Sequence, residues 1–157
     1  MPYKRKTWKE KLQDDKDLPK VVKIDIRMNK RWGSGTIAIP APREVDEIMR
    51  SVPKGKLTTI NQIREKVAKS HGATIGCPIC TGIFANIAAH AAEEDAAAGR
   101  KDITPYWRTL KSKGELNEKY PGGTKRQSER LRKEGHTIVR SKGKRPPTIK
   151  DFEKKLV

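Results

Sequence analysis

Cysteines, aromatic residues and long apolar runs are all scarce in this chain. Only two of its 157 residues are cysteines, and Phe, Trp and Tyr together make up 5%. Two cysteines do not make a disulfide framework, so the fold has to be held together by packing. No apolar run approaches the roughly 20 residues that a membrane-spanning helix needs, and residues 1–6 lead into charges rather than into a signal-peptide core. These absences exclude a disulfide scaffold and a spanning helix, and they predict a cytoplasmic location.

Basic residues, by contrast, are in large excess. Lys and Arg number 36 against 19 Asp and Glu, which gives a formal net charge of +17. This excess exceeds what solubility requires and predicts a polyanionic partner, first of all nucleic acid, which would associate the protein with the nucleoid. An RNA-binding or ribosome-binding basic module is the alternative reading of the same charge.

Length and apolar content suit one domain of ordinary size with extensions. Residues 1–41 are predicted as a basic N-terminal extension, with a short helix at residues 8–12 and extended segments at residues 21–26 and 36–39. Removing residues 1–33 is expected to weaken DNA binding and to leave the rest of the chain folded.

Three helices are predicted between residues 42 and 98. Apolar residues at helical spacing predict the first over residues 42–52, and Thr59 with Gln62 fits a capping box that starts the second, at residues 59–72. Pro78 suits the first turn of the third, over residues 78–98. This third helix is expected to turn four large side chains inward: Ile79, Ile83, Phe84 and Ile87. Helices joined by a short turn suggest a helix-turn-helix.

A fourth helix and a hairpin are predicted in the C-terminal part. Thr124 and Gln127 match a second capping box, and the helix that follows buries Leu131 and stops at Gly135. Residues 136–139 and 148–149 are expected to pair as a basic hairpin, which would act as a wing. The prediction is a mainly α fold with small β elements, in which residues 42–157 form a winged helix-turn-helix domain.

Four motifs in order resemble one family. They are Val52-Pro-Lys-Gly-Lys-Leu-Thr-Thr-Ile-Asn-Gln-Ile63, Pro105-Tyr-Trp-Arg108, Tyr120-Pro-Gly-Gly123 and Leu131-Arg-Lys-Glu-Gly135. The order and the residues are similar to the C-terminal domain of alkylguanine-DNA alkyltransferases (methylated-DNA-protein-cysteine methyltransferases). The resemblance implies a winged helix-turn-helix whose second helix enters the minor groove and helps to rotate a nucleotide into a pocket. It also implies a monomer that binds double-stranded DNA and needs no cofactor.

Four departures from the family pattern bear on the chemistry. Tyr106 stands where the family has its alkyl-accepting cysteine, and Trp107 stands where it has the histidine that helps to activate that cysteine. A phenol with a pKa of about 10 is a poorer nucleophile than a thiolate, so direct repair is not expected. Ile60 replaces the tyrosine associated with nucleotide rotation, and Gly82 replaces the arginine that fills the vacated base stack. The chain thus resembles the non-catalytic alkyltransferase-like branch, which recognises alkylated DNA without repairing it.

Ten residues of these motifs and of the third predicted helix are predicted as DNA contacts: Thr58, Thr59, Ile60, Pro78, Thr81, Gly82, Asn86, Tyr106, Trp107 and Arg108. Two alternatives stay open for the last three. The rings of Tyr106 and Trp107 suit either stacking on a base or filling the core. Arg108 and Glu134 match the family motif and suit an internal ion pair that supports the fold as well as a ligand role.

Cys77 and Cys80 form a CxxC at the start of the third predicted helix, where the helix dipole would lower a thiol pKa. They are therefore candidate reactive thiols, and one of them acting as a relocated alkyl acceptor in DNA repair is an alternative function. Small packing residues are the simpler interpretation. No metal site is expected, because zinc needs about four ligands and His90 lies about 15 Å along the helix from Cys80.

Overall fold

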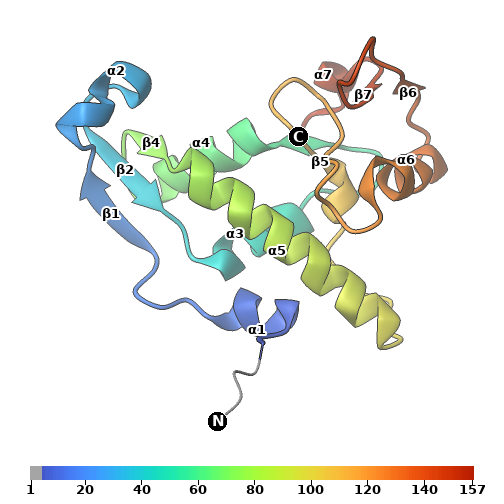
Figure 1. Cartoon of the computed structure of the whole chain (residues 1–157), viewed down its shortest axis with the longest axis horizontal. Helices are drawn as coiled ribbons and strands as arrows, with labels where there is room; N and C mark the ends of the chain where they lie inside the picture. Colours follow the sequence, from blue (N-terminus) through green and yellow to red (C-terminus); the bar gives the residue numbers. More distant parts are fainter. Residues whose placement is uncertain (1–4) are drawn as a thin grey trace.

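A 20-residue helix, α5 (Pro78–Ala97), runs through the middle of the computed structural model, which describes residues 5–157 (Figure 1). Pro78 occupies the first turn and the Cys77 side chain caps the helix, which ends just before Gly99. The buried face consists of alanines, which allow close approach of neighbouring helices. They are Ala85, Ala88, Ala89, Ala91 and Ala92.

The predicted orientation of this helix is partly wrong. Phe84 and Ile87 are partly buried against the core, but Ile79 and Ile83 have exposed fractions of 59% and 53%. Both isoleucines lie on the side of α5 opposite the close-packed alanine face. Because a helix can bury only part of its circumference, the alanine contacts with α1 and α3 leave the first two turns with their isoleucines in solvent.

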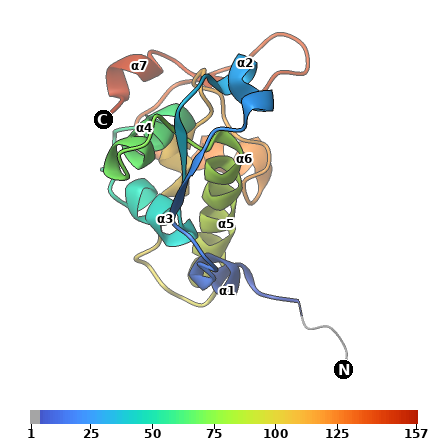
Figure 2. The same ribbon diagram turned by 90° about the vertical axis from the view of Figure 1, so that its left-hand side faces the viewer.

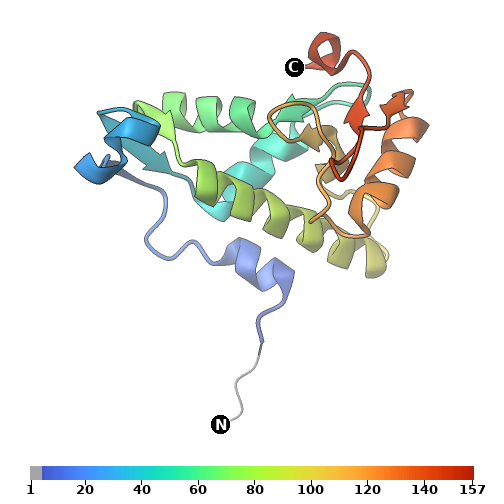
Figure 3. The same ribbon diagram turned by 45° about the horizontal axis from the view of Figure 1, so that its top comes forward.

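Helices α1 (Trp8–Gln13), α3 (Pro42–Arg50) and α4 (Ile60–Ser70) pack around α5 (Figures 1 and 3). All three were predicted, with ends that differ by at most two residues. Met49, Ile63 and Val67 are fully buried between them. A second cluster is centred on Ile24, Ile37 and Cys77. No helix within residues 5–157 is both long enough and apolar enough to cross a membrane.

Three small sheets complete the fold. Strands β1 (Lys20–Lys23) and β2 (Thr36–Ile39) pair antiparallel, and β2 pairs parallel with β4 (Ile75–Gly76). Strand β3 (Thr58–Thr59) pairs parallel with β5 (Thr109–Leu110). The predicted C-terminal hairpin is present as β6 (Ile138–Val139) and β7 (Thr148–Ile149). It lies with α6 (Gly123–Lys133) at the end of the molecule opposite the first sheet (Figure 1).

Four short elements occupy the remaining segments. They are η1 (Ile26–Met28), α2 (Asn29–Trp32), η2 (Tyr106–Arg108) and α7 (Phe152–Lys155). The first two extend the hairpin formed by β1 and β2, and the turned view shows them projecting beyond the sheet (Figure 2). The turn η2 contains Tyr106, the position at which the sequence resemblance expects a reactive cysteine.

Of the two threonines predicted to start a capping box, only Thr59 caps its helix. The Thr59 side chain accepts a hydrogen bond from the Gln62 amide and caps α4. Helix α6 instead begins at Gly123 after Gly122, whose left-handed φ of 77° favours glycine, and no side chain caps it. Gln127 is drawn into the interior, where it accepts from the Asn117 amide and donates to the Trp107 carbonyl.

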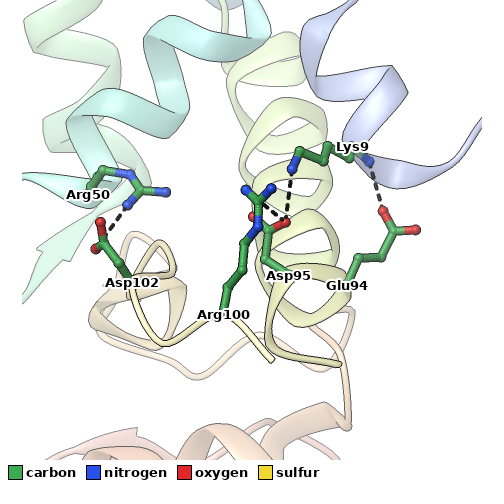
Figure 4. A network of polar contacts seen from close by, with 6 residues as sticks. All are labelled: Lys9, Arg50, Glu94, Asp95, Arg100 and Asp102. Carbon is green, nitrogen blue, oxygen red and sulfur yellow. Dashed lines mark hydrogen bonds and ion pairs between the residues drawn. The ribbon is translucent and has the colours of Figure 1, made fainter. Parts of the chain in front are cut away.

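Residues 1–41 were predicted as an extension, and that boundary stays a prediction. Within them, Leu12 of α1 is buried in the main core. The Lys9 amide donates to Glu94 at 2.8 Å, and the Lys9 ammonium group lies 3.2 Å from Asp95, both near the end of α5 (Figure 4). Arg100 also pairs with Asp95. These contacts hold α1 against α5 as part of the same packed unit.

Candidate nucleic-acid interface

Tyr106, at the position of the family's reactive cysteine, is sealed inside the protein. Its side chain has no exposed area, and its ring meets the rings of Trp107 and Tyr120 edge-on, with centroids 5.3 and 5.4 Å away. Its hydroxyl donates to Glu93 at 2.6 Å. Burial, and then the Glu93 carboxylate, raise the pKa of Tyr106 above its ordinary value. The phenol is therefore neutral and has no access to a DNA lesion in this conformation.

Arg108 and Glu134 form the internal ion pair that was one of the two predicted roles. The Arg108 guanidinium donates to both carboxylate oxygens of Glu134 and, through Nη1, to the carbonyl of Val52 at 2.7 Å. The Trp107 indole N–H also donates to Glu134 at 3.1 Å. Burial opposes ionisation, but the bonds from Arg108 and Trp107 outweigh it and hold the pKa of Glu134 below its ordinary value. This cluster ties η2 to the end of α6 and to the segment before β3.

A basic pocket of about 350 Å³ lies on the outer side of Trp107. Arg130 stacks its guanidinium over the indole at 4.5 Å and binds Glu93, which Arg126 also binds. Burial raises the pKa of Glu93, but the hydrogen bonds from Tyr106, Arg126 and Arg130 outweigh this effect and lower the pKa below its ordinary value. The carboxylate neutralises much of the charge here, so this pocket is a weak candidate for phosphate binding.

A larger hollow, of about 680 Å³, lies between α1, α5 and the segment that follows β5. It brings together three predicted contact residues: Ile60, Gly82 and Asn86. The Asn86 side-chain oxygen is buried and has no hydrogen-bond partner among residues 5–157. The lining is mainly apolar and includes three lysines and one glutamate: the residues besides those three are Trp8, Lys11, Ile79, Ile83, Ile87, Lys111, Asn117, Glu118 and Lys119.

Trp8 and Lys111 were missed by the sequence reasoning. Trp8 lies in α1, where its ring stacks on His90 at 4.3 Å and holds Lys11 over its other side at 4.2 Å. The Thr7–Glu10 capping box was a signal that this segment is an ordered helix, since both hydrogen bonds of the box are present. No local signal places Lys111 beside α5, because that contact depends on how the chain returns after β5.

Other predicted contact residues lie in the interior instead of at this surface. Thr58 and Thr59 are buried in β3, and Thr81 lies on the buried side of α5. Pro78 is partly exposed beside Ile79, and Gly82 has no heavy atom within 4 Å of the place where a Cβ would stand. The open part of the predicted site is therefore the first two turns of α5 together with Ile60.

Cys77 and Cys80 lie together at the start of α5. Cys77 is buried, and its sulfur accepts a hydrogen bond from the Cys80 amide at 3.3 Å as the cap of α5. Burial, and then Cys77, raise the pKa of Cys80 to about 11. The predicted lowering by the helix dipole is therefore wrong for Cys80, because desolvation outweighs it. Residues 5–157 contain no group of three or more His, Cys, Asp or Glu side chains arranged to hold a metal ion.

Comparison with known proteins identifies the fold. No protein-family model and no curated protein matches the chain. Two solved structures of an S. pombe protein do: Atl1 in complex with damaged DNA containing O6-carboxymethylguanine, and ATL in complex with DNA. Each has a TM-score of 0.53 and 20% identity, and covers 74% of this chain and 93% of the other. The chain thus shares the fold of an alkyltransferase-like protein, which confirms the predicted mainly helical fold with small β elements.

Proposed function

We propose that this protein, with its alkyltransferase-like fold, binds double-stranded DNA as a monomer without reacting with it. One observation carries the proposal. Ile79 and Ile83 in the first two turns of α5 are exposed beside a mainly apolar hollow that three lysines also line, whereas Tyr106, at the position of the family's reactive cysteine, is buried. A mainly apolar surface that also carries lysines suits a duplex, whose bases lie between two rows of phosphates.

In this proposal the other family elements keep their family roles. Helices α4 and α5 act as a helix-turn-helix, with α5 in the minor groove. The hairpin β6–β7 acts as the wing, and its connecting loop is exposed and basic through Arg140, Lys142, Lys144 and Arg145. Such side chains contact phosphates and contribute affinity without sequence preference.

Recognition of alkylated or otherwise damaged DNA is the finer part of the proposal. It is supported by the fold shared with Atl1, which has been solved with damaged DNA containing O6-carboxymethylguanine. The test is a titration of matched duplexes with and without one O6-alkylguanine, at fixed salt. We expect tighter binding to the alkylated duplex. Equal affinities for the two duplexes would contradict damage recognition but would still support DNA binding.

Two other functions are distinguished from this one by two further experiments, a measurement of protein mass and a competition with RNA. A relocated alkyl acceptor would leave a stable mass increase on Cys77 or Cys80, which the burial of Cys77 and the raised pKa of Cys80 argue against. We expect no change in protein mass and no loss of the alkyl group from the DNA. An RNA or ribosome-binding module would prefer structured RNA over duplex DNA in competition at matched salt.

A further inference from the structure

Ile79 and Ile83 are an unusual pair of exposed residues. They lie one helical turn apart, so their side chains emerge on the same face about 5–6 Å apart. Between them in sequence, Gly82 adds no side chain that would shield them, and nothing lies within 4 Å of where its Cβ would be. Two isoleucines more than half exposed at the end of a long helix mark a contact surface rather than a folding requirement.

The charges around this pair indicate what covers it. Lys11, Lys111 and Lys119 line the same hollow as the two isoleucines, and Lys113 follows on the same segment. Lys111 is paired with Glu118, whereas Lys113 and Lys119 have no side-chain ion pair among residues 5–157. An apolar edge beside unpaired cations is poorly suited to a second copy of this basic chain, since the lysines would repel. The same surface suits duplex DNA, whose stacked bases are flanked by phosphate anions.

We propose that Ile79 and Ile83 form an apolar wedge that enters the base stack of duplex DNA from the minor groove and kinks it. This inference rests on the proposed DNA-binding function and adds to it the way in which α5 engages the duplex. Apolar side chains inserted between base steps unstack them, and the resulting bend brings more of the duplex onto the protein surface. Lys113 and Lys119 then contact the phosphates on the flank of the opened step.

The inserted isoleucines and the phosphate-binding lysines differ in how they affect the salt dependence of DNA binding. A side chain that inserts without touching phosphate contributes affinity through buried apolar area, so its removal leaves the salt dependence of binding unchanged. A lysine on phosphate does the opposite, because its removal lowers the slope of log K against log salt by about 0.9. The two kinds of residue on this surface are therefore separable by titration at several salt concentrations.

The experiment uses the full chain and a duplex of about two helical turns, with end labels for energy transfer and one 2-aminopurine at its centre. Wild type should shorten the end-to-end distance and raise the 2-aminopurine fluorescence on binding, as an unstacked, bent duplex does. Ile83→Ser and Ile79→Ser should each weaken binding about tenfold and abolish both signals, with the salt slope unchanged. Lys113→Ala should lower the salt slope and keep both signals at saturation.

Ile26→Ser is the matched control, because Ile26 is 82% exposed and lies in η1, away from the hollow. It should behave as wild type. Thermal melts check that each variant is folded, as expected for exposed positions.

Wild-type binding without a bend, or an Ile83→Ser variant that still bends DNA, would overturn the wedge and leave DNA binding intact. Absence of any DNA binding by wild type would instead overturn the proposed function, and isoleucine-dependent self-association without DNA would assign the pair to a protein contact.

Discussion

At the scale of single residues, the position of Tyr106 bears most directly on the expected absence of alkyl transfer. A tyrosine in place of a cysteine already argues against alkyl transfer, but it leaves open whether the ring meets a base. The structure places the ring between Trp107 and Tyr120 and its hydroxyl on Glu93. Core packing, one of the two predicted roles, is the one that the structure shows.

Tyr106→Phe tests this placement. The variant loses the hydrogen bond to Glu93, while Glu93 keeps Arg126 and Arg130. We expect the free energy of unfolding to fall by about 1 kcal/mol, the contribution of a typical hydrogen bond. Denaturant titration measures this change. DNA affinity should stay the same, and a marked loss of affinity at unchanged stability would place Tyr106 in the interface instead.

At the scale of elements, the start of α4 shows how far a local pattern determines a structure. Both Thr59 and Thr124 precede a glutamine by three residues, which is the spacing of a capping box. Thr59 caps its helix, but its partner Gln62 bonds the Thr58 hydroxyl and the Val157 carbonyl rather than completing the box. Thr124 lies inside α6 and caps nothing.

The two threonines give a matched pair of variants. Thr59→Ala should lower the free energy of unfolding by about 1 kcal/mol, because the Gln62 amide at the start of α4 loses its acceptor. Thr124→Ala should change it by less than about 0.5 kcal/mol, as most surface substitutions do. Thermal or denaturant unfolding distinguishes them. Equal effects would show that the cap at Thr59 does not stabilise α4.

At the scale of the whole molecule, the N-terminal segment is part of the packed fold. Helix α1 covers α5, and β1 and β2 form a sheet with β4, which precedes α5. The same helix supplies Trp8 and Lys11 to the hollow beside the proposed wedge. The segment therefore supports both the core and the candidate interface, and its positive charge is only one part of its role.

Leu12→Ala measures how much α1 contributes. Leu12 is buried in the main core, so we expect a loss of about 2 kcal/mol in the free energy of unfolding. Lys9→Ala, which removes a partly exposed ion pair with Asp95, should cost less than about 1 kcal/mol.

Removal of residues 1–33 should lower stability as well as DNA affinity, contrary to the expectation from sequence. A truncated chain that melts like wild type would restore that expectation.

The sequence by itself determined the positions of α1, α3, α4, α5 and α6, the C-terminal hairpin and the absence of the acceptor cysteine, but not the short elements η1, α2, η2 and α7. Pro78, the Thr59 cap and the β-branched run of β2 act on neighbouring residues, so local patterns suffice to locate them. Only the tertiary structure decided which face of α5 is buried, where Gln127 points, how the cysteine environment shifts the pKa of Cys80 and that Trp8 joins the hollow. Each of these depends on competition between surfaces far apart in sequence. Close packing of the alanines on α5 outweighs the larger apolar area of Ile79 and Ile83, and so leaves these two residues exposed at the proposed DNA interface.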